Sequence, residues 1–184
     1  MIILGIDPGI ARTGWCVLEV SAASSSSDGK PAARSAGGHF DLRALGIGCI
    51  ETRREDPSEN LPQIAVRLKI LGEALRSLIL KWRPASMAIE ELFFLKKSPS
   101  AFSVAEARGV LLFVAAKEGV PVFEYNPRSV KTSLTGSGAA DKNQMQKMVQ
   151  RILNLPSIPS PDDAADAAAI ALCHYFTNVR RSAI

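Results

Sequence analysis

The sequence predicts an α/β fold built on one mixed five-stranded sheet. Short apolar runs typical of buried strands are followed by long stretches in which apolar residues recur at helical spacing. The first three strand-like runs have no helix between them, which favours antiparallel pairing. The later strands are separated by helices, as parallel strands must be. The two halves of the pattern together indicate a mixed sheet with helices packed on it.

The predicted strands are short and rich in apolar and β-branched residues. The first lies in "IILGIDPG" and ends on the carboxylate Asp7, after which Pro8 and Gly9 mark a tight turn. If the strand order is 3-2-1-4-5, the first and fourth strands are neighbours. The five strands are predicted at residues 2–6, 13–20, 46–52, 85–90 and 120–125.

The predicted helices follow the third strand. Leu68, Leu71 and Leu75 belong to an apolar series at helical spacing, and Pro84 marks the end of that helix. Ser98 and Pro99 are a cap and first-turn pair for the next one. The helices are predicted at residues 61–82, 98–117, 127–133, 140–153 and 161–177.

One segment interrupts this pattern. Residues 21–43 contain four consecutive serines together with Gly, Ala and Pro, and they show no apolar period. This composition predicts a flexible insert that lengthens the connection between the second and third strands. The rest of residues 1–184 is expected to form a single domain.

The composition fits a globular domain and excludes several classes of protein. The chain has 184 residues, of which 47% are hydrophobic and 22% charged, with a net charge of +4 that is compatible with nucleic acid. No apolar run approaches the roughly 18–20 residues that cross a membrane, and no signal peptide is evident. The three cysteines form no CxxC pair, which argues against a zinc site and suits a reducing cytoplasm.

Carboxylates end the two strands that are predicted to be neighbours. Asp7 ends the first strand, and Glu90 or Glu91 ends the fourth. In open α/β sheets functional groups collect at the carboxyl ends of strands, particularly where the strand order reverses. Asp-Pro-Gly is also an ordinary turn signal, and an acid at a strand end is often simply solvated. Neither position alone identifies a site.

A third source of carboxylates is the helix in "SPDDAADAAAIAL". Asp166 shares a helix face with Asp163 or with Asp162, at spacings of three or four residues. First-turn acids also suit the positive end of the helix dipole, but Asp166 lies deeper, among alanines that let a helix approach a sheet closely. Clustered carboxylates need cations, and Mg²⁺ or Mn²⁺ suits them. Two such ions about 3.5–4 Å apart hydrolyse phosphodiesters.

Five motifs, in this order and spacing, resemble the RuvC family of Holliday-junction resolvases, the crossover junction endodeoxyribonucleases. They are "IILGIDPG", "AIEELFF", "EARGVLLFVAA", "PVFEYNPRSVK" and "DDAADAAAIALCH". The resemblance covers nearly the whole chain except residues 21–43. It implies a ribonuclease-H-like fold with strand order 3-2-1-4-5 and helices on both faces. It also implies a homodimer that uses Mg²⁺ or Mn²⁺, with two ions in each active site.

The resemblance also assigns site residues by motif position. It excludes the neighbours Glu91 and Asp162 from the metal site. It implies that Phe93 stacks on or wedges between bases, and that Lys131 and Lys142 face DNA. A core Phe and solvated surface lysines are the ordinary alternatives. The four catalytic, metal-binding acids that it implies are Asp7, Glu90, Asp163 and Asp166.

The expected function is therefore structure-selective DNA cleavage. The resemblance implies a metal-dependent endonuclease that resolves four-way junctions by symmetric paired nicking in recombination and repair, with branch-migration motor proteins as partners. A related alternative is a nuclease of the same fold acting on RNA or other branched DNA. An actin-like ATPase would need a duplicated domain, for which the chain is too short. A protein that only binds junctions would gain nothing from clustered negative charge near DNA.

Overall fold

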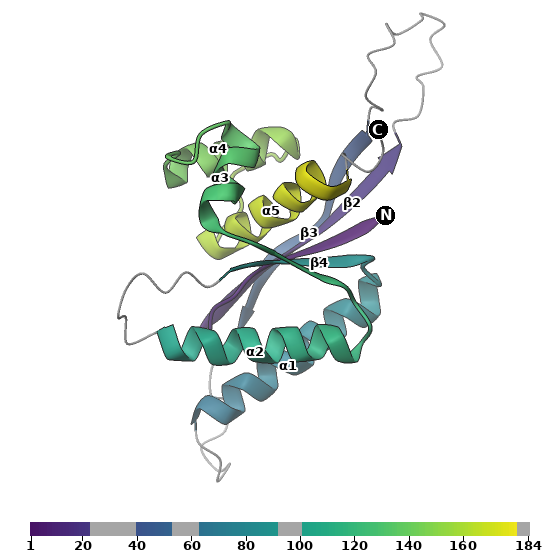
Figure 1. The fold of residues 1–184 in the computed structure, drawn as a ribbon, viewed down its shortest axis with the longest axis vertical. Coiled ribbons are helices and arrows are strands. Elements are labelled where there is room, and N and C mark those ends of the chain that lie inside the picture. Colours follow the sequence, from purple (N-terminus) through teal and green to yellow (C-terminus); the bar gives the residue numbers. More distant parts are fainter. Residues whose placement is uncertain (23–39, 53–62, 92–100, 180–184) are drawn as a thin grey trace, which may run out of the picture.

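A five-stranded mixed sheet is the central layer of the protein. The structure is a computed structural model that describes residues 1–22, 40–52, 63–91 and 101–179 (Figure 1). The strand order is β3-β2-β1-β4-β5, and the pairing is antiparallel among β1, β2 and β3 and parallel from β1 through β4 to β5. The predicted sheet is therefore confirmed. The strands are β1 (Ile2–Asp7), β2 (Arg12–Ala22), β3 (Phe40–Glu51), β4 (Ser86–Glu90) and β5 (Val122–Tyr125).

Helices cover both faces of the sheet, as expected. Helices α1 and α2 lie on one face, and α5 lies on the other with α3 and α4 beside it (Figure 1). Within the described residues, no helix is long and apolar enough to cross a membrane. The helices are α1 (Gln63–Trp82), α2 (Ala101–Lys117), α3 (Pro127–Thr135), α4 (Lys142–Ile152) and α5 (Asp162–His174), which continues into a π-helical turn, Tyr175–Val179.

Alternation along the strands sends side chains to two separate apolar cores. Ile3 packs with α5, whereas Leu4 and Ile6 pack with α1 and α2. In β4, Ala88 faces α5 in the same way, and its neighbours Met87 and Ile89 face the opposite side. Because successive side chains point to opposite faces of the sheet, the same alternation predicts the face on which the last side chain of each strand lies. Asp7 and Glu90 belong to the face that α5 covers.

Helix α5 lies unusually close to β1 and β2 because glycines face it. A Cβ at Gly5 would overlap the backbone carbonyl of Ala167, and a Cβ at Gly14 would overlap that of Asp163. The alanines of α5 complete this close fit, since most of them are fully buried. The first turn of α5 therefore lies over Gly14 of β2, which is the register partner of Asp7 on β1.

The predicted boundaries of the insert are wrong at both ends. Strand β2 runs to Ala22 and β3 begins at Phe40, so residues 21–22 and 40–43 pair in the sheet. The sequence contained the signal for this. Phe40, Leu42 and Ala44 alternate with polar residues and pack against the core on the α5 side. Residues 23–39 lie outside the described residues, as do Ser98 and Pro99, the predicted cap of α2.

Candidate active site

Strands β1 and β4 end side by side, and each ends on a carboxylate. Ile6 pairs with Ile89 in the parallel register, so Asp7 and Glu90 are the next residues along each strand. Both project to the α5 side, and their carboxyl groups share a hydrogen bond. Glu91 is exposed, and its backbone N–H donates to the carbonyl of Tyr125 at 2.8 Å. Alternation directs its side chain away from Glu90.

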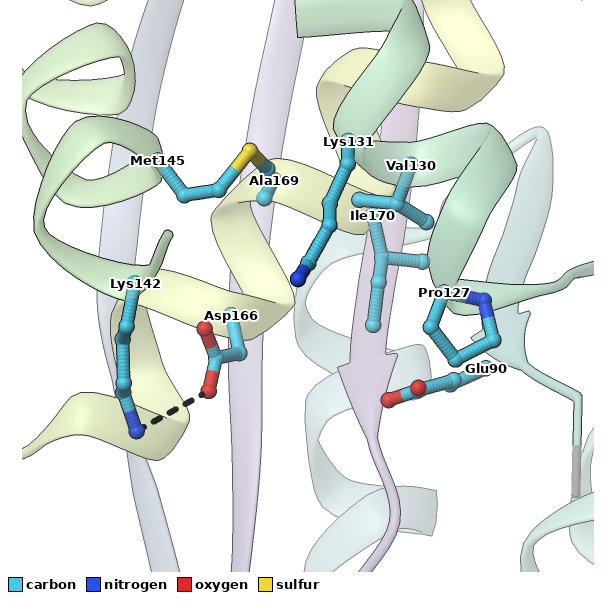
Figure 2. A pocket seen from close by; sticks show the side chains of 9 residues that line it. All are labelled: Glu90, Pro127, Val130, Lys131, Lys142, Met145, Asp166, Ala169 and Ile170. Carbon is cyan, nitrogen blue, oxygen red and sulfur yellow. Dashed lines mark ion pairs between the residues drawn. The ribbon is translucent and has the colours of Figure 1, made fainter. Parts of the chain in front are cut away.

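Helix α5 brings two further acids to the same place. Asp166 and Glu90 line one pocket of about 260 Å³ (Figure 2). Asp163 lies where α5 crosses Gly14, which is the register partner of Asp7. Both helix acids act electrostatically on Asp7. The four acids that the resemblance assigns are therefore close together in the structure.

Asp162 points elsewhere. Its side chain is 66% exposed and faces α4, where Lys142 Nζ lies 3.0 Å from its Oδ2. The amide of Gln146 donates to its Oδ1 at 3.0 Å. These contacts hold its pKa below the usual range, with the hydrogen bond from Lys142 as the largest cause. The rotation of α5 thus turns Asp162 toward α4, where Lys142 links it to Asp166. Asp163, not Asp162, acts electrostatically on Asp7.

Clustering raises the pKa of the acids at the strand ends. Burial is the largest cause for Asp7, and repulsion by Glu90, Asp166 and Asp163 adds to it, which together raise the pKa of Asp7 to about 8. Burial also raises the pKa of Glu90. At neutral pH Asp7 therefore holds a proton and shares it with Glu90.

Cations stand beside the helix acids. Arg12 Nε lies 3.3 Å from Asp163 Oδ2, and Lys142 Nζ lies 3.5 Å from Asp166 Oδ2. Figure 2 shows Lys142 and Lys131 entering the site from α4 and α3. Burial raises the pKa of Asp166, and the attraction of Lys142 partly offsets this. The resemblance placed both lysines facing DNA, which stays a prediction, and Arg12, separated from Asp7 by a turn, was not predicted from the sequence.

The donor set fits a divalent cation, although the side chains are not yet arranged around one. No three His, Cys, Asp or Glu among the residues that the structure describes are already positioned to hold a metal ion. The chemistry nevertheless fits, because hard carboxylate oxygens converge and repel one another. Asp163 Oδ2 is buried without a hydrogen bond, and Asp7 stays protonated to about pH 8. A bound cation would give Asp163 Oδ2 a partner and would favour the ionised form of Asp7.

One predicted site residue, Phe93, lies outside the described residues. Its neighbours on the described side are Glu90 and Glu91 at the end of β4. Its proposed contact with bases therefore stays a prediction.

Residues 3–174 match the family model described as Crossover junction endodeoxyribonuclease RuvC. This chain belongs to the RuvC family. It is 45% identical to the crossover junction endodeoxyribonuclease RuvC of Endomicrobium trichonymphae, over 96% of this chain and 82% of that protein. It is 47% identical to the RuvC of Roseiflexus sp. (strain RS-1), over 94% of this chain and 89% of that one.

Solved RuvC structures share the architecture. The Thermus thermophilus RuvC structure has a TM-score of 0.79 at 32% identity, covering 100% of this chain and 98% of that chain. T. thermophilus RuvC in complex with Holliday junction substrate has a TM-score of 0.75 at 31% identity, covering 96% and 94%. The yeast mitochondrial resolvase Ydc2, at 16% identity and a TM-score of 0.55, shares the fold. The predicted ribonuclease-H-like fold is confirmed.

Proposed function

We propose that this protein is a divalent-metal-dependent endonuclease that resolves four-way DNA (Holliday) junctions. The observation that carries the proposal is the convergence of four carboxylates from β1, β4 and α5 in a chain of the RuvC family. Relatives across the full chain are named crossover junction endodeoxyribonucleases. A related protein has been solved with a Holliday junction. Action on RNA, the alternative considered from the sequence, has no comparable support.

The roles of the four acids follow from where they stand. Asp7 and Glu90 lie on rigid strand ends, and Asp163 and Asp166 lie on a helix locked against the sheet by Gly5 and Gly14. The four would hold two Mg²⁺ or Mn²⁺ ions, which supply an activated water and positive charge at the leaving oxygen. Asp7 must first release its proton, because only a carboxylate is a good ligand.

Basic side chains beside the acids support contact with the DNA backbone. Lys131 and Lys142 line the same pocket as Glu90 and Asp166 (Figure 2). Lysines in this pocket would offset the negative charge of the acids and hold phosphates next to the one that is cleaved. Phe93 would stack on bases near the cut, which rests on the resemblance alone.

Paired nicking of opposite strands calls for two active sites, and we propose that they belong to a homodimer. Helix α2 exposes large apolar side chains, with Phe102 82% and Phe113 65% exposed. Such a face supports burial against a second copy. Branch-migration motor proteins are proposed as partners from the resemblance. A reducing cytoplasm is proposed because all three cysteines are free thiols.

The decisive experiment is cleavage of a synthetic four-way junction labelled in turn on each strand. With Mg²⁺ we expect nicks at symmetric positions in two opposing strands, and with EDTA none. Linear duplex and an RNA–DNA hybrid are the controls for structure and for nucleic acid type. Equal cleavage of the hybrid or the duplex would overturn the proposal, as would junction cleavage that persists in Asp7→Asn.

A further inference from the structure

Arg12 lies next to the four acids, and the proposed reaction gives it no role. It is the first residue of β2, two positions before Gly14 and therefore on the same face of the sheet. Asp163 crosses the strand at Gly14, which places its carboxylate next to the guanidinium. The 3.3 Å contact between Nε and Oδ2 thus follows from the close fit of α5 on β2.

This contact occupies a carboxylate that the proposed metal site needs. Asp163 Oδ2 has no hydrogen bond, so Arg12 is the charge that compensates it. Oδ2 itself is buried, but the Arg12 side chain is 53% exposed, so water reaches the guanidinium side of the ion pair. An ion pair of this kind is weak and can open. An exposed guanidinium released beside the acids would also be well placed to pair with a phosphate.

We propose that Arg12 is a positioning residue that competes with the divalent cation for Asp163 and transfers to a DNA phosphate when the cation binds. The inference rests on the proposed function. In the metal-free protein Arg12 neutralises Asp163 and lowers the affinity of the site for cations. In the loaded protein its guanidinium adds one phosphate contact. Metal binding and junction binding therefore strengthen each other through Arg12, and the coupling is reciprocal.

The first test is Mn²⁺ binding without DNA, measured by calorimetry at low salt. Arg12→Gln should bind Mn²⁺ about two- to fivefold more tightly, as expected for loss of a half-exposed ion pair. Arg12→Lys keeps a cation beside Asp163 and should stay close to the original affinity. Lys147→Gln removes the same charge from α4, at an exposed position that lines a different pocket, and should change nothing. Metal-free thermal unfolding checks that each variant is folded.

The second test compares junction affinity with Ca²⁺ and without metal. Arg12→Gln should reduce the slope of log affinity against log salt by up to about one unit with Ca²⁺, and by less without it. Equal or weaker Mn²⁺ binding by Arg12→Gln would overturn the inference while leaving the proposed nuclease intact. Unchanged Mn²⁺ binding by Asp7→Asn would show that the ion lies elsewhere and would overturn both proposals.

Discussion

The active site has two halves, and the negative charge of their carboxyl groups is compensated in different ways. The strand half, Asp7 and Glu90, is partly buried and shares a proton, and the charges of Glu90, Asp166 and Asp163 all raise the pKa of Asp7. The helix half, Asp163 and Asp166, is more accessible and stands beside Arg12 and Lys142. The strand half is neutralised by protonation and the helix half by ion pairs. Metal binding must remove a proton from one half and displace cations from the other.

The largest expected effect is loss of cleavage when either half loses a carboxylate. Asp7→Asn or Asp163→Asn should reduce junction cleavage by at least about a thousandfold, because each removes a ligand from the metal site. Junction binding should survive, since less negative charge near phosphates does not oppose association. Cleavage and binding are measured on the same labelled junction under saturating Mg²⁺.

The matched control for the helix half is Asp162→Asn, one residue from Asp163 but directed at α4. It should retain most of the activity. An inactive Asp162→Asn together with an active Asp163→Asn would mean that α5 is rotated from the orientation described. Activity in both would remove the helix from the site altogether. For the strand half, Glu91→Gln is the corresponding control for Glu90→Gln.

The second effect is a pH dependence of stability that comes from the proton held by the strand half. The pKa of Asp7 is raised from 3.8 to about 8 in the folded protein, so unfolding between these values releases a proton. The associated stability is fully present below about pH 4 and is lost as pH rises through 8. Metal-free Asp7→Asn has no titrating carboxyl at this position, so it does not lose this stability as pH rises. Its free energy of unfolding should rise relative to the original protein between pH 5 and 9, by an amount on the order of 4 kcal/mol, since each of the roughly three pH units below the pKa of Asp7 counts about 1.4 kcal/mol.

Thermal unfolding in EDTA at several pH values measures this difference. Asp162→Asn is the opposite case, because the pKa of Asp162 is lowered in the folded protein. Its removal should give no gain in stability at high pH. If the original protein and Asp7→Asn keep the same stability difference from pH 5 to 9, the strand half is not held by a shared proton.

A third, smaller effect distinguishes the two lysines. Lys131→Ala and Lys142→Ala should each weaken junction binding and reduce its salt slope by up to about one unit. Only Lys142 also pairs with Asp166 and Asp162, so only its loss should tighten Mn²⁺ binding without DNA. Salt titrations with Ca²⁺ and calorimetry with Mn²⁺ provide the two measurements. Identical behaviour in both assays would show that the ion pairs of Lys142 have no bearing on metal binding.

The smallest effect is expected from a change far from the active site, in the connection between β2 and β3. Ala22 and Phe40 are register partners, so an Asn-Gly turn between them can replace residues 23–39 and close the β2–β3 hairpin. Cleavage and melting temperature should stay nearly unchanged, because the Ser-rich composition predicts a segment without a packed role. A large loss of either would assign this segment a structural or functional part.

Much of this protein was determined by local sequence. Apolar runs and helical spacing led to the mixed sheet and its helices, because burial of one face imposes its own period on a strand or a helix. The same logic put Asp7 and either Glu90 or Glu91 at strand ends, and the family resemblance favoured Glu90. The alternation of Phe40, Leu42 and Ala44 was also present in the sequence, although their polar neighbours obscured it.

Only the tertiary structure decided what stands beside each acid. Spacing along α5 left Asp162 and Asp163 equivalent, and the family resemblance alone favoured Asp163. The rotation of the helix depends on how it packs against Gly5 and Gly14, which are distant in the chain. The ion pair of Arg12 with Asp163 has the same origin. Charge interactions depend on distance and burial in space, so no pattern along the sequence could have shown that the two halves of the site are neutralised differently.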